Sequence, residues 1–140
     1  MKKLLFILTA LTLIATGCKK EEKKIDYKSA IVGEWHCAPA DMDADIYVEF
    51  KAEGSFSLYQ QLGEGRYRKY TGSWTCEGNV LSGVYTDGTP WGSTYRLDLN
   101  ADTLTMTALN GSDEAMTYAK QSIPDEVLED CIEVKSGGAL

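Results

Sequence analysis

Hydrophobic and polar residues alternate with a period of two along most of the chain beyond residue 28. Because successive side chains of an extended strand point to opposite faces, this period predicts strands with one apolar face. Clusters of Gly, Asn, Asp and Pro interrupt the alternation at regular intervals and predict turns. The expected strands lie at 30–37, 45–51, 56–62, 66–76, 80–86, 95–99, 103–109 and 114–121.

The short connections between these segments predict how the sheet is closed. A sheet with one apolar face either exposes two unpaired edges or closes on itself, and closure removes the edges. We therefore expect an all-β fold, in which a single domain at 29–140 forms an eight-stranded up-and-down antiparallel barrel. A short C-terminal tail follows the last strand, and 125–131 is expected to form one or two helical turns.

The first 17 residues show a different pattern. Lys2 and Lys3 precede an uncharged run at 4–17 that is rich in Leu, Ile, Ala and Thr, which is the order of a secretory signal peptide. A run of this length is too short for a membrane-spanning helix, which needs about 20 apolar residues. We expect 1–17 to be removed as a signal peptide.

The end of this segment, Ala15-Thr16-Gly17-Cys18, resembles the lipobox of bacterial lipoproteins, although Ala15 stands where Leu is usual. The resemblance implies that the mature chain begins at an acylated Cys18. The alternative is an ordinary signal peptide followed by an incidental cysteine. Because two or more acyl chains hold a protein stably at a bilayer, we expect a palmitate-type anchor in the cell outer membrane.

A charged segment at 18–28 separates Cys18 from the predicted barrel. Its core, Lys-Lys-Glu-Glu-Lys-Lys at 19–24, has no apolar surface to bury and favours a mobile tether. Lys20-Glu21-Glu22 resembles the surface-export signal of Bacteroidetes-type lipoproteins, but a solvated spacer explains the same charges. The sequence therefore leaves both the periplasmic face and the cell surface open.

The charge of the barrel domain limits its partners. Residues 29–140 contain 7 Lys and Arg against 18 Asp and Glu, a net charge of about −11, whereas the whole chain carries −7. An acidic surface repels the phosphate backbone. We exclude nucleic acid and expect the membrane, a small ligand or an envelope protein as partners.

Four segments carry a resemblance to a known family: I-V-G-E-W at 31–35, Y-V-E-F-K-A-E-G-S-F-S-L-Y at 47–59, Y-T-G-S-W-T-C-E-G-N-V-L-S at 70–82, and S-I-P-D-E-V at 122–127. Their order and spacing resemble the lipocalin-like domains of the calycin superfamily that are common in Bacteroidetes lipoproteins. The resemblance implies that Gly33 and Trp35 close the barrel base. It also implies that a cation of the last strand covers Trp35, and Lys120 stands where the family has Arg.

The lumen of an eight-stranded barrel is either filled by side chains or able to hold one small ligand. Gln60 and Tyr70 on the inner face would each cost ~1 to 3 kcal/mol if buried without a partner, which favours a ligand or water in the lumen. An acidic rim suits a cationic or amphipathic ligand. The alternative is a structural lipoprotein whose filled barrel presents its loops to an envelope partner. The candidate ligand-binding residues are Gln60, Tyr70, Trp74, Trp91 and Tyr95.

Catalysis and metal binding find little support in the sequence. His36 is the only histidine, and its strand position places it on the outer face, so no Ser-His-acid order includes it. Asp41, Asp43 and Asp45 have the opening spacing of a calcium loop, but Ile46 and Ala52 replace its required Gly and Glu. We expect a protein that is not an enzyme and has no cofactor or metal.

Three cysteines follow Cys18, so at most one disulfide can form among them. We expect Cys76 to pair with Cys131, because the strand of Cys76 and the last strand both end at the barrel base. Cys37 lies at the opposite rim, although the connection to Cys131 is long enough to keep that alternative open.

Overall fold

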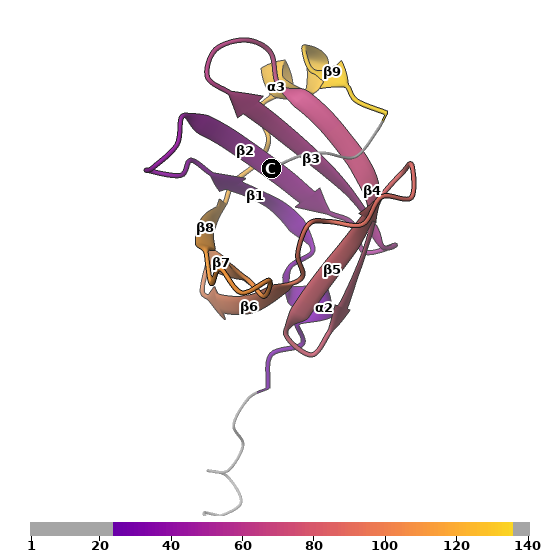
Figure 1. Ribbon diagram of the computed structural model, residues 1–140, viewed down its shortest axis with the longest axis vertical. Helices are drawn as coiled ribbons and strands as arrows, with labels where there is room; N and C mark the ends of the chain where they lie inside the picture. Colours follow the sequence, from indigo (N-terminus) through magenta and orange to yellow (C-terminus); the bar gives the residue numbers. More distant parts are fainter. Residues whose placement is uncertain (1–23, 136–140) are drawn as a thin grey trace, which may run out of the picture.

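The structure is a computed structural model that describes residues 24–135. Each of the first seven strands pairs antiparallel with the next, and β1 pairs with β8, so the ring of eight is closed (Figure 1). The predicted all-β, eight-stranded up-and-down barrel is therefore confirmed. The strands are β1 (Gly33–Cys37), β2 (Ala44–Phe50), β3 (Ser55–Leu62), β4 (Arg68–Glu77), β5 (Val80–Tyr85), β6 (Tyr95–Asn100), β7 (Thr103–Ala108) and β8 (Ala115–Lys120).

Three further elements lie outside the ring: helix α2 (Tyr27–Ala30) before it, then helix α3 (Asp125–Glu129) and strand β9 (Ile132–Glu133) after it. Within residues 24–135, neither helix has the length and apolar character that crossing a membrane requires. We call the end where β1, β3, β5 and β7 begin the closed end, and the end where they finish the open end.

Two tryptophans and the main chain around them seal the closed end. The indole Nε1 of Trp35 donates a hydrogen bond to the carbonyl oxygen of Ile31 at 2.9 Å, and that of Trp74 donates to Ser55 at 3.0 Å. Both rings are almost fully buried. Because each buried N–H is paired, the rings fill the barrel base without a desolvation penalty.

The cation contact that the resemblance implies is present at this end. The Nζ atom of Lys120 lies 4.9 Å from the ring centroid of Trp35, its partner in the β1–β8 register. Gly33 has a φ of 139°, and a Cβ there would lie 3.0 Å from the Lys120 Nζ. Gly33 therefore supplies both the backbone conformation and the space that the Lys120 side chain occupies.

Helix α2 begins inside the segment for which the sequence predicts a tether. Its first residue, Tyr27, packs against the core, and the Asp26 carbonyl oxygen accepts hydrogen bonds from the amides of Ser29 and Ala30. The short turn covers the closed end, so β1 begins at Gly33 rather than at residue 30. The predicted tether ends earlier than expected because Tyr27 has an apolar ring that packs against the core, whereas the charged residues before it have no apolar surface to bury.

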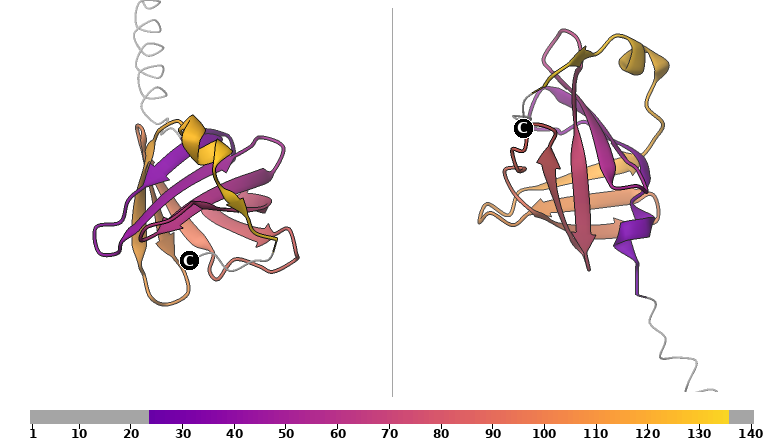
Figure 2. Two further views of the ribbon diagram at one scale, coloured as in Figure 1. Left: turned by 90° about the horizontal axis from the view of Figure 1, so that it is seen from above. Right: turned by 90° about the vertical axis from the view of Figure 1, so that its right-hand side faces the viewer.

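The C-terminal tail turns back along the outside of the barrel. Ile123 and Val127 pack on Tyr47 and Tyr59, which point outward from β2 and β3. Beyond α3, β9 pairs in parallel with the first residues of β4, Arg68 and Lys69, at the open end (Figures 1 and 2). The helical turn at 125–131 is as predicted, whereas β9 is not predicted.

The predicted disulfide between Cys76 and Cys131 is wrong. Ile132 pairs with Arg68, which places Cys131 beside the start of β4, whereas Cys76 lies near the end of that strand. Eight residues at ~3.3 Å each separate the two ends by roughly 26 Å, far more than the ~6 Å between bridged Cα atoms. The tail leaves the base and returns to the open end, so Cys37, Cys76 and Cys131 are free thiols.

Candidate functional site

A cavity of about 350 Å³ occupies the open half of the barrel. Alternate residues of β2, β3, β7 and β8 point into it, as the period of two requires. Most of the lining is apolar, and it includes a pair of neighbouring methionines, Met106 and Met116, that lie opposite each other in the β7–β8 register. Flexible thioether side chains adapt to irregular shapes. The apolar lining consists of Met42, Ile46, Val48, Phe50, Phe56, Leu58, Met106, Ala108 and Met116.

One wall of the cavity is formed by a loop instead of a paired strand. The β5–β6 ladder contains only Val80–Arg96 and Leu81–Tyr95, after which the two strands part. The connection between them folds back, and the Trp91 amide donates a hydrogen bond to the Gly83 carbonyl oxygen at 2.9 Å. The opening that the diverging strands leave is thereby closed by Trp91.

The position of Trp91 depends on a glycine. A Cβ atom at Gly83 would lie 2.3 Å from the Trp91 ring, so only glycine lets the ring rest on β5. The ring then meets Phe56 edge-on at 5.2 Å between centroids and Tyr95 at 6.1 Å. These contacts fix an aromatic side chain in the wall of the cavity.

Two polar side chains lie deep in this apolar surrounding. Gln60 is 3% exposed and forms no side-chain hydrogen bond with any residue of the described chain. No buried side-chain N or O atom in that part of the chain is sealed off without a partner, so the amide of Gln60 faces the hollow. Tyr118 also lines the cavity, and burial raises the pKa of its hydroxyl well above the ordinary value. Tyr118 therefore stays neutral at physiological pH.

A second hollow of about 390 Å³ adjoins the cavity at the β3–β4 hairpin, and Gln60 lines both. This hollow is more polar than the first. Its charged residues are Glu64, Arg66 and Arg68, and Tyr70 lies at its inner side. The open end therefore offers an apolar volume next to a charged one.

A separate polar cluster lies on the outer face of the barrel. Asp45 accepts a hydrogen bond from the Tyr67 hydroxyl and lies 2.6 Å from the Nε2 atom of His36. The His36 ring stacks on Tyr47 with 4.4 Å between centroids. Burial, and then the hydrogen bond to Asp45, raises the pKa of Tyr67. The cluster links β1, β2 and the segment before β4, and it faces away from the cavity.

The acidic run Asp41-x-Asp43-x-Asp45 does not assemble a metal site in the structure. Asp45 is engaged by His36 and Tyr67 on the outer face. Within residues 24–135, no three His, Cys, Asp or Glu side chains are grouped closely enough to hold a metal ion.

The candidate ligand-binding residues divide into three groups. Gln60, Trp91 and Tyr95 line the cavity, and Tyr70 lines the adjoining hollow. Trp74 lines neither, because its register places it at the closed end, where its Nε1 bonds to the main chain. That assignment is therefore corrected: the alternation shows which face Trp74 occupies but not its height in the barrel.

Sequence reasoning missed several lining residues. Met106, Met116 and Tyr118 lie on strands whose alternation already places them inward. Arg68 was also missed, although its spacing from Tyr70 puts the two on one face. The signal was present in the period of two, but the strand register was needed to show which inward residues share the open end.

A match to a protein family agrees with this architecture. The family described as the lipocalin-like domain matches residues 21–106. No curated protein sequence matches the chain. Among solved structures, the chain is similar to the lipoprotein YedD from Klebsiella pneumoniae subsp. pneumoniae, with 14% identity and a TM-score of 0.46 over 69% of this chain and 78% of that one. Because the family match covers more than half of its length, the chain belongs to the lipocalin-like domain family.

Proposed function

We propose that the barrel binds a small apolar or amphipathic molecule in the cavity of its open half, and that lipid on Cys18 holds the protein at the outer membrane. The observation that carries the first part is an apolar cavity of about 350 Å³ whose wall contains the unpaired amide of Gln60. A barrel with a purely structural role gains nothing from an unfilled lumen, since each void forfeits packing energy. The filled-barrel alternative is therefore disfavoured.

The size of the cavity sets the scale of the ligand and its affinity. A volume of 350 Å³ lies at the lower end of the ~300 to 1,000 Å³ typical of ligand pockets. Burying roughly 200 to 300 Å² of apolar surface contributes on the order of 5 to 8 kcal/mol. Association costs consume part of this energy, so we expect dissociation constants at or above the micromolar range.

The residues around the cavity support binding rather than catalysis. The titratable groups in its lining are Glu114 and three tyrosines, and burial raises the pKa of Tyr95 and Tyr118. His36, the histidine of the chain, lies on the outer face and bonds to Asp45. Histidine is the most common general acid or base, and the cavity lining in the described chain contains none.

The attachment part of the proposal rests on the sequence, because Cys18 lies outside the described residues. It is supported by the signal peptide pattern and by the lipobox resemblance. Helix α2 lies at the closed end, so the described chain enters the barrel opposite the cavity mouth (Figure 1). An anchor at Cys18 leaves the mouth free to meet ligand from the aqueous side.

The test is saturable binding of the apolar dye N-phenyl-1-naphthylamine, followed by dye fluorescence. Ala108 lines the cavity, whereas Ala119 on the neighbouring strand is exposed, so the two offer a matched pair for substitution by Trp. We expect Ala108→Trp to abolish dye binding and Ala119→Trp to leave it unchanged. Absence of saturable binding in the wild type, or equal binding by both variants, would contradict the proposal.

A further inference from the structure

The hollow beside the apolar cavity is lined by a cation, Arg68, which is exposed at the open end. Arg68 begins β4, and its alternation with the buried side chains of Tyr70 and Trp74 places it on the inner face. In the β3–β4 register, Arg68 lies directly opposite Gln60. Residues paired in this way share a face, with Cβ atoms ~5 Å apart. The side chains of Arg68 and Gln60 therefore start side by side, and both line the hollow.

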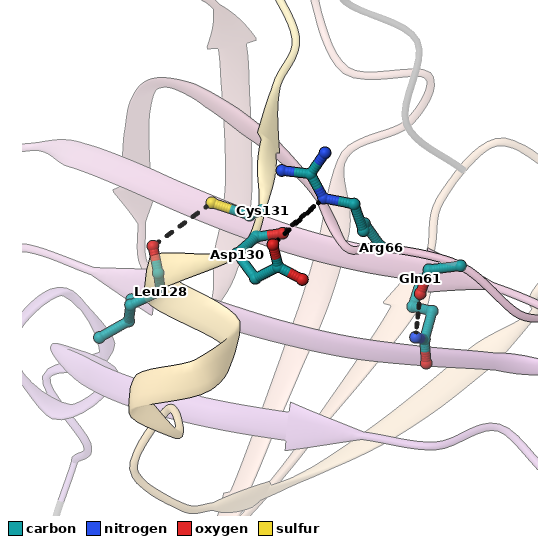
Figure 3. Close-up of polar contacts among 6 residues, drawn as sticks. Gln61, Arg66, Leu128, Asp130 and Cys131 are labelled. Carbon is teal, nitrogen blue, oxygen red and sulfur yellow. Dashed lines mark hydrogen bonds and ion pairs between the residues drawn. The ribbon is translucent and has the colours of Figure 1, made fainter.

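Arg68 forms no ion pair within the described part of the chain, whereas Arg66 does. The Arg66 Nε atom donates a hydrogen bond to the Asp130 carbonyl oxygen at 3.0 Å and lies 3.4 Å from the Asp130 Oδ1 (Figure 3). Figure 3 shows that this contact joins the hairpin to the end of α3, next to Cys131. Arg66 thus holds the tail, and Arg68 has no ion pair among residues 24–135.

The donors around the hollow match an anionic oxygen group. The guanidinium of Arg68 offers several N–H donors in a plane, and the amide of Gln60 offers two more. The hydroxyl of Tyr70, which is buried at the same side, can donate another. Charge-assisted hydrogen bonds of this kind are about twice as strong as neutral ones. For a cationic group, the one oppositely charged side chain in this lining is Glu64 at the exposed hairpin tip.

The acidic character of the domain does not cancel this local arrangement. Exposed charges separated by more than a Debye length of ~8 Å are largely screened at physiological salt. The acidic residues that line the two hollows are Glu64 and Glu114, and Glu114 belongs to the β7–β8 side of the mouth. On the β3–β4 side the lining charges are Glu64, Arg66, which is paired with Asp130, and Arg68.

We propose that the natural ligand is an amphiphile with an anionic head group, whose head binds between Arg68 and Gln60 while its apolar part fills the cavity. This inference rests on the proposed function and names the chemical class of its ligand. A carboxylate and a phosphate monoester both offer the required oxygens, so the test includes one of each.

The experiment uses the full mature chain carrying Cys18→Ser, so that no detergent competes for the cavity. Displacement of N-phenyl-1-naphthylamine is measured with decanoate, decyl phosphate, 1-decanol and decyltrimethylammonium. We expect decanoate or decyl phosphate to bind at least tenfold tighter than decanol, and the cation to bind more weakly than decanol. The tighter of the two anions identifies the head group.

Two variants test whether the preference for an anionic head group depends on Arg68. Arg68→Gln is expected to reduce the anion preference to less than threefold. Arg96→Gln removes the same charge from an exposed outward position of β6 and is expected to keep the preference. A wild type that binds dye but treats decanoate, decyl phosphate and decanol alike, or prefers the cation, overturns this inference and leaves the proposed function intact. A wild type that binds neither dye nor any decyl compound overturns both.

Discussion

The ring of Trp91 rests on the backbone of Gly83, at a place where even a methyl group would lie 2.3 Å from it. Trp91 comes from the loop that follows β5, and its amide bonds to the Gly83 carbonyl oxygen at 2.9 Å. The loop replaces the strand pairing that β5 and β6 abandon after Leu81. The wall of the cavity is therefore set by one loop residue and the glycine beneath it.

Substitution of Gly83 by Ala should expel Trp91 from this position. Because the added methyl group overlaps the ring, we expect a stability loss of about 1 to 3 kcal/mol, as for other overpacked sites. One of the three tryptophans should also become more accessible to acrylamide quenching. Gly92→Ala is the control, since a Cβ there meets nothing within 4 Å. Equal quenching of the two variants would show that Gly83 does not position the ring.

At Gln60 we expect the requirements of folding stability and of ligand binding to conflict. Residue 60 is 3% exposed and lines a cavity whose wall is mostly apolar, so Gln60→Leu should add apolar burial and raise the free energy of unfolding by about 1 kcal/mol. The same change should remove the preference for decanoate over decanol. Gln61→Leu is the matched control, because the Gln61 Nε2 atom already donates to the Gly65 carbonyl oxygen at 2.6 Å. Urea unfolding that shows Gln60→Leu less stable than the wild type would contradict the expectation.

The period of two was enough to predict the strands and the closed ring, because one buried face per strand admits few other arrangements. Lys120 over Trp35 could be inferred from the family resemblance. The height of Trp74 in the barrel could not, since alternation fixes a face and only the register fixes a level. The Arg68–Gln60 pair was missed for the same reason.

The tail was the least predictable element. Tyr47 and Tyr59 point outward, and two aromatic residues on the outer face of adjacent strands are a signal for a covering segment. That signal does not identify which segment covers them. The choice of α3 depends on the long-range contacts of Ile123 and Val127, and these carry the chain back toward the start of β4. The predicted pairing of Cys76 with Cys131 failed because it assumed that the tail stays at the base.

Docking of the tail should depend on Val127 and not on its neighbour Leu128. Val127 is 5% exposed against Tyr47 and Tyr59, whereas Leu128 is 44% exposed. We expect Val127→Ala to cost about 1 to 2 kcal/mol and to speed hydrogen exchange at the amides of Ile132 and Val134, which donate to the carbonyl oxygens of Tyr67 and Lys69. Leu128→Ala should change neither quantity. Unchanged exchange at both amides in Val127→Ala would mean that β9 is held independently of α3.

The buried tyrosines predict a loss of stability at high pH. Burial raises the pKa of Tyr118 above the ~10 of an unfolded chain, so the folded state favours the neutral hydroxyl. This contribution is fully present below pH ~10 and is lost as the pH rises from that value through the higher folded pKa. We expect urea unfolding to show a steep decline above pH 10, and Tyr118→Phe to make the decline shallower. An identical pH dependence in the variant would assign the effect to other groups.

The last prediction concerns membrane attachment, which can be tested independently of ligand binding by the barrel. If Cys18 carries lipid, the mature protein should fractionate with membranes and show an intact mass above that of the unmodified chain from Cys18 onward. Cys18→Ser should be released into the aqueous phase with its dye affinity unchanged, since α2 and the barrel do not depend on the anchor. Protease treatment of whole cells then separates the two orientations: digestion indicates the surface, and protection indicates the periplasmic face. A wild-type mass without acyl chains would remove the anchor from the proposal while leaving the cavity and its ligand to be judged by dye binding alone.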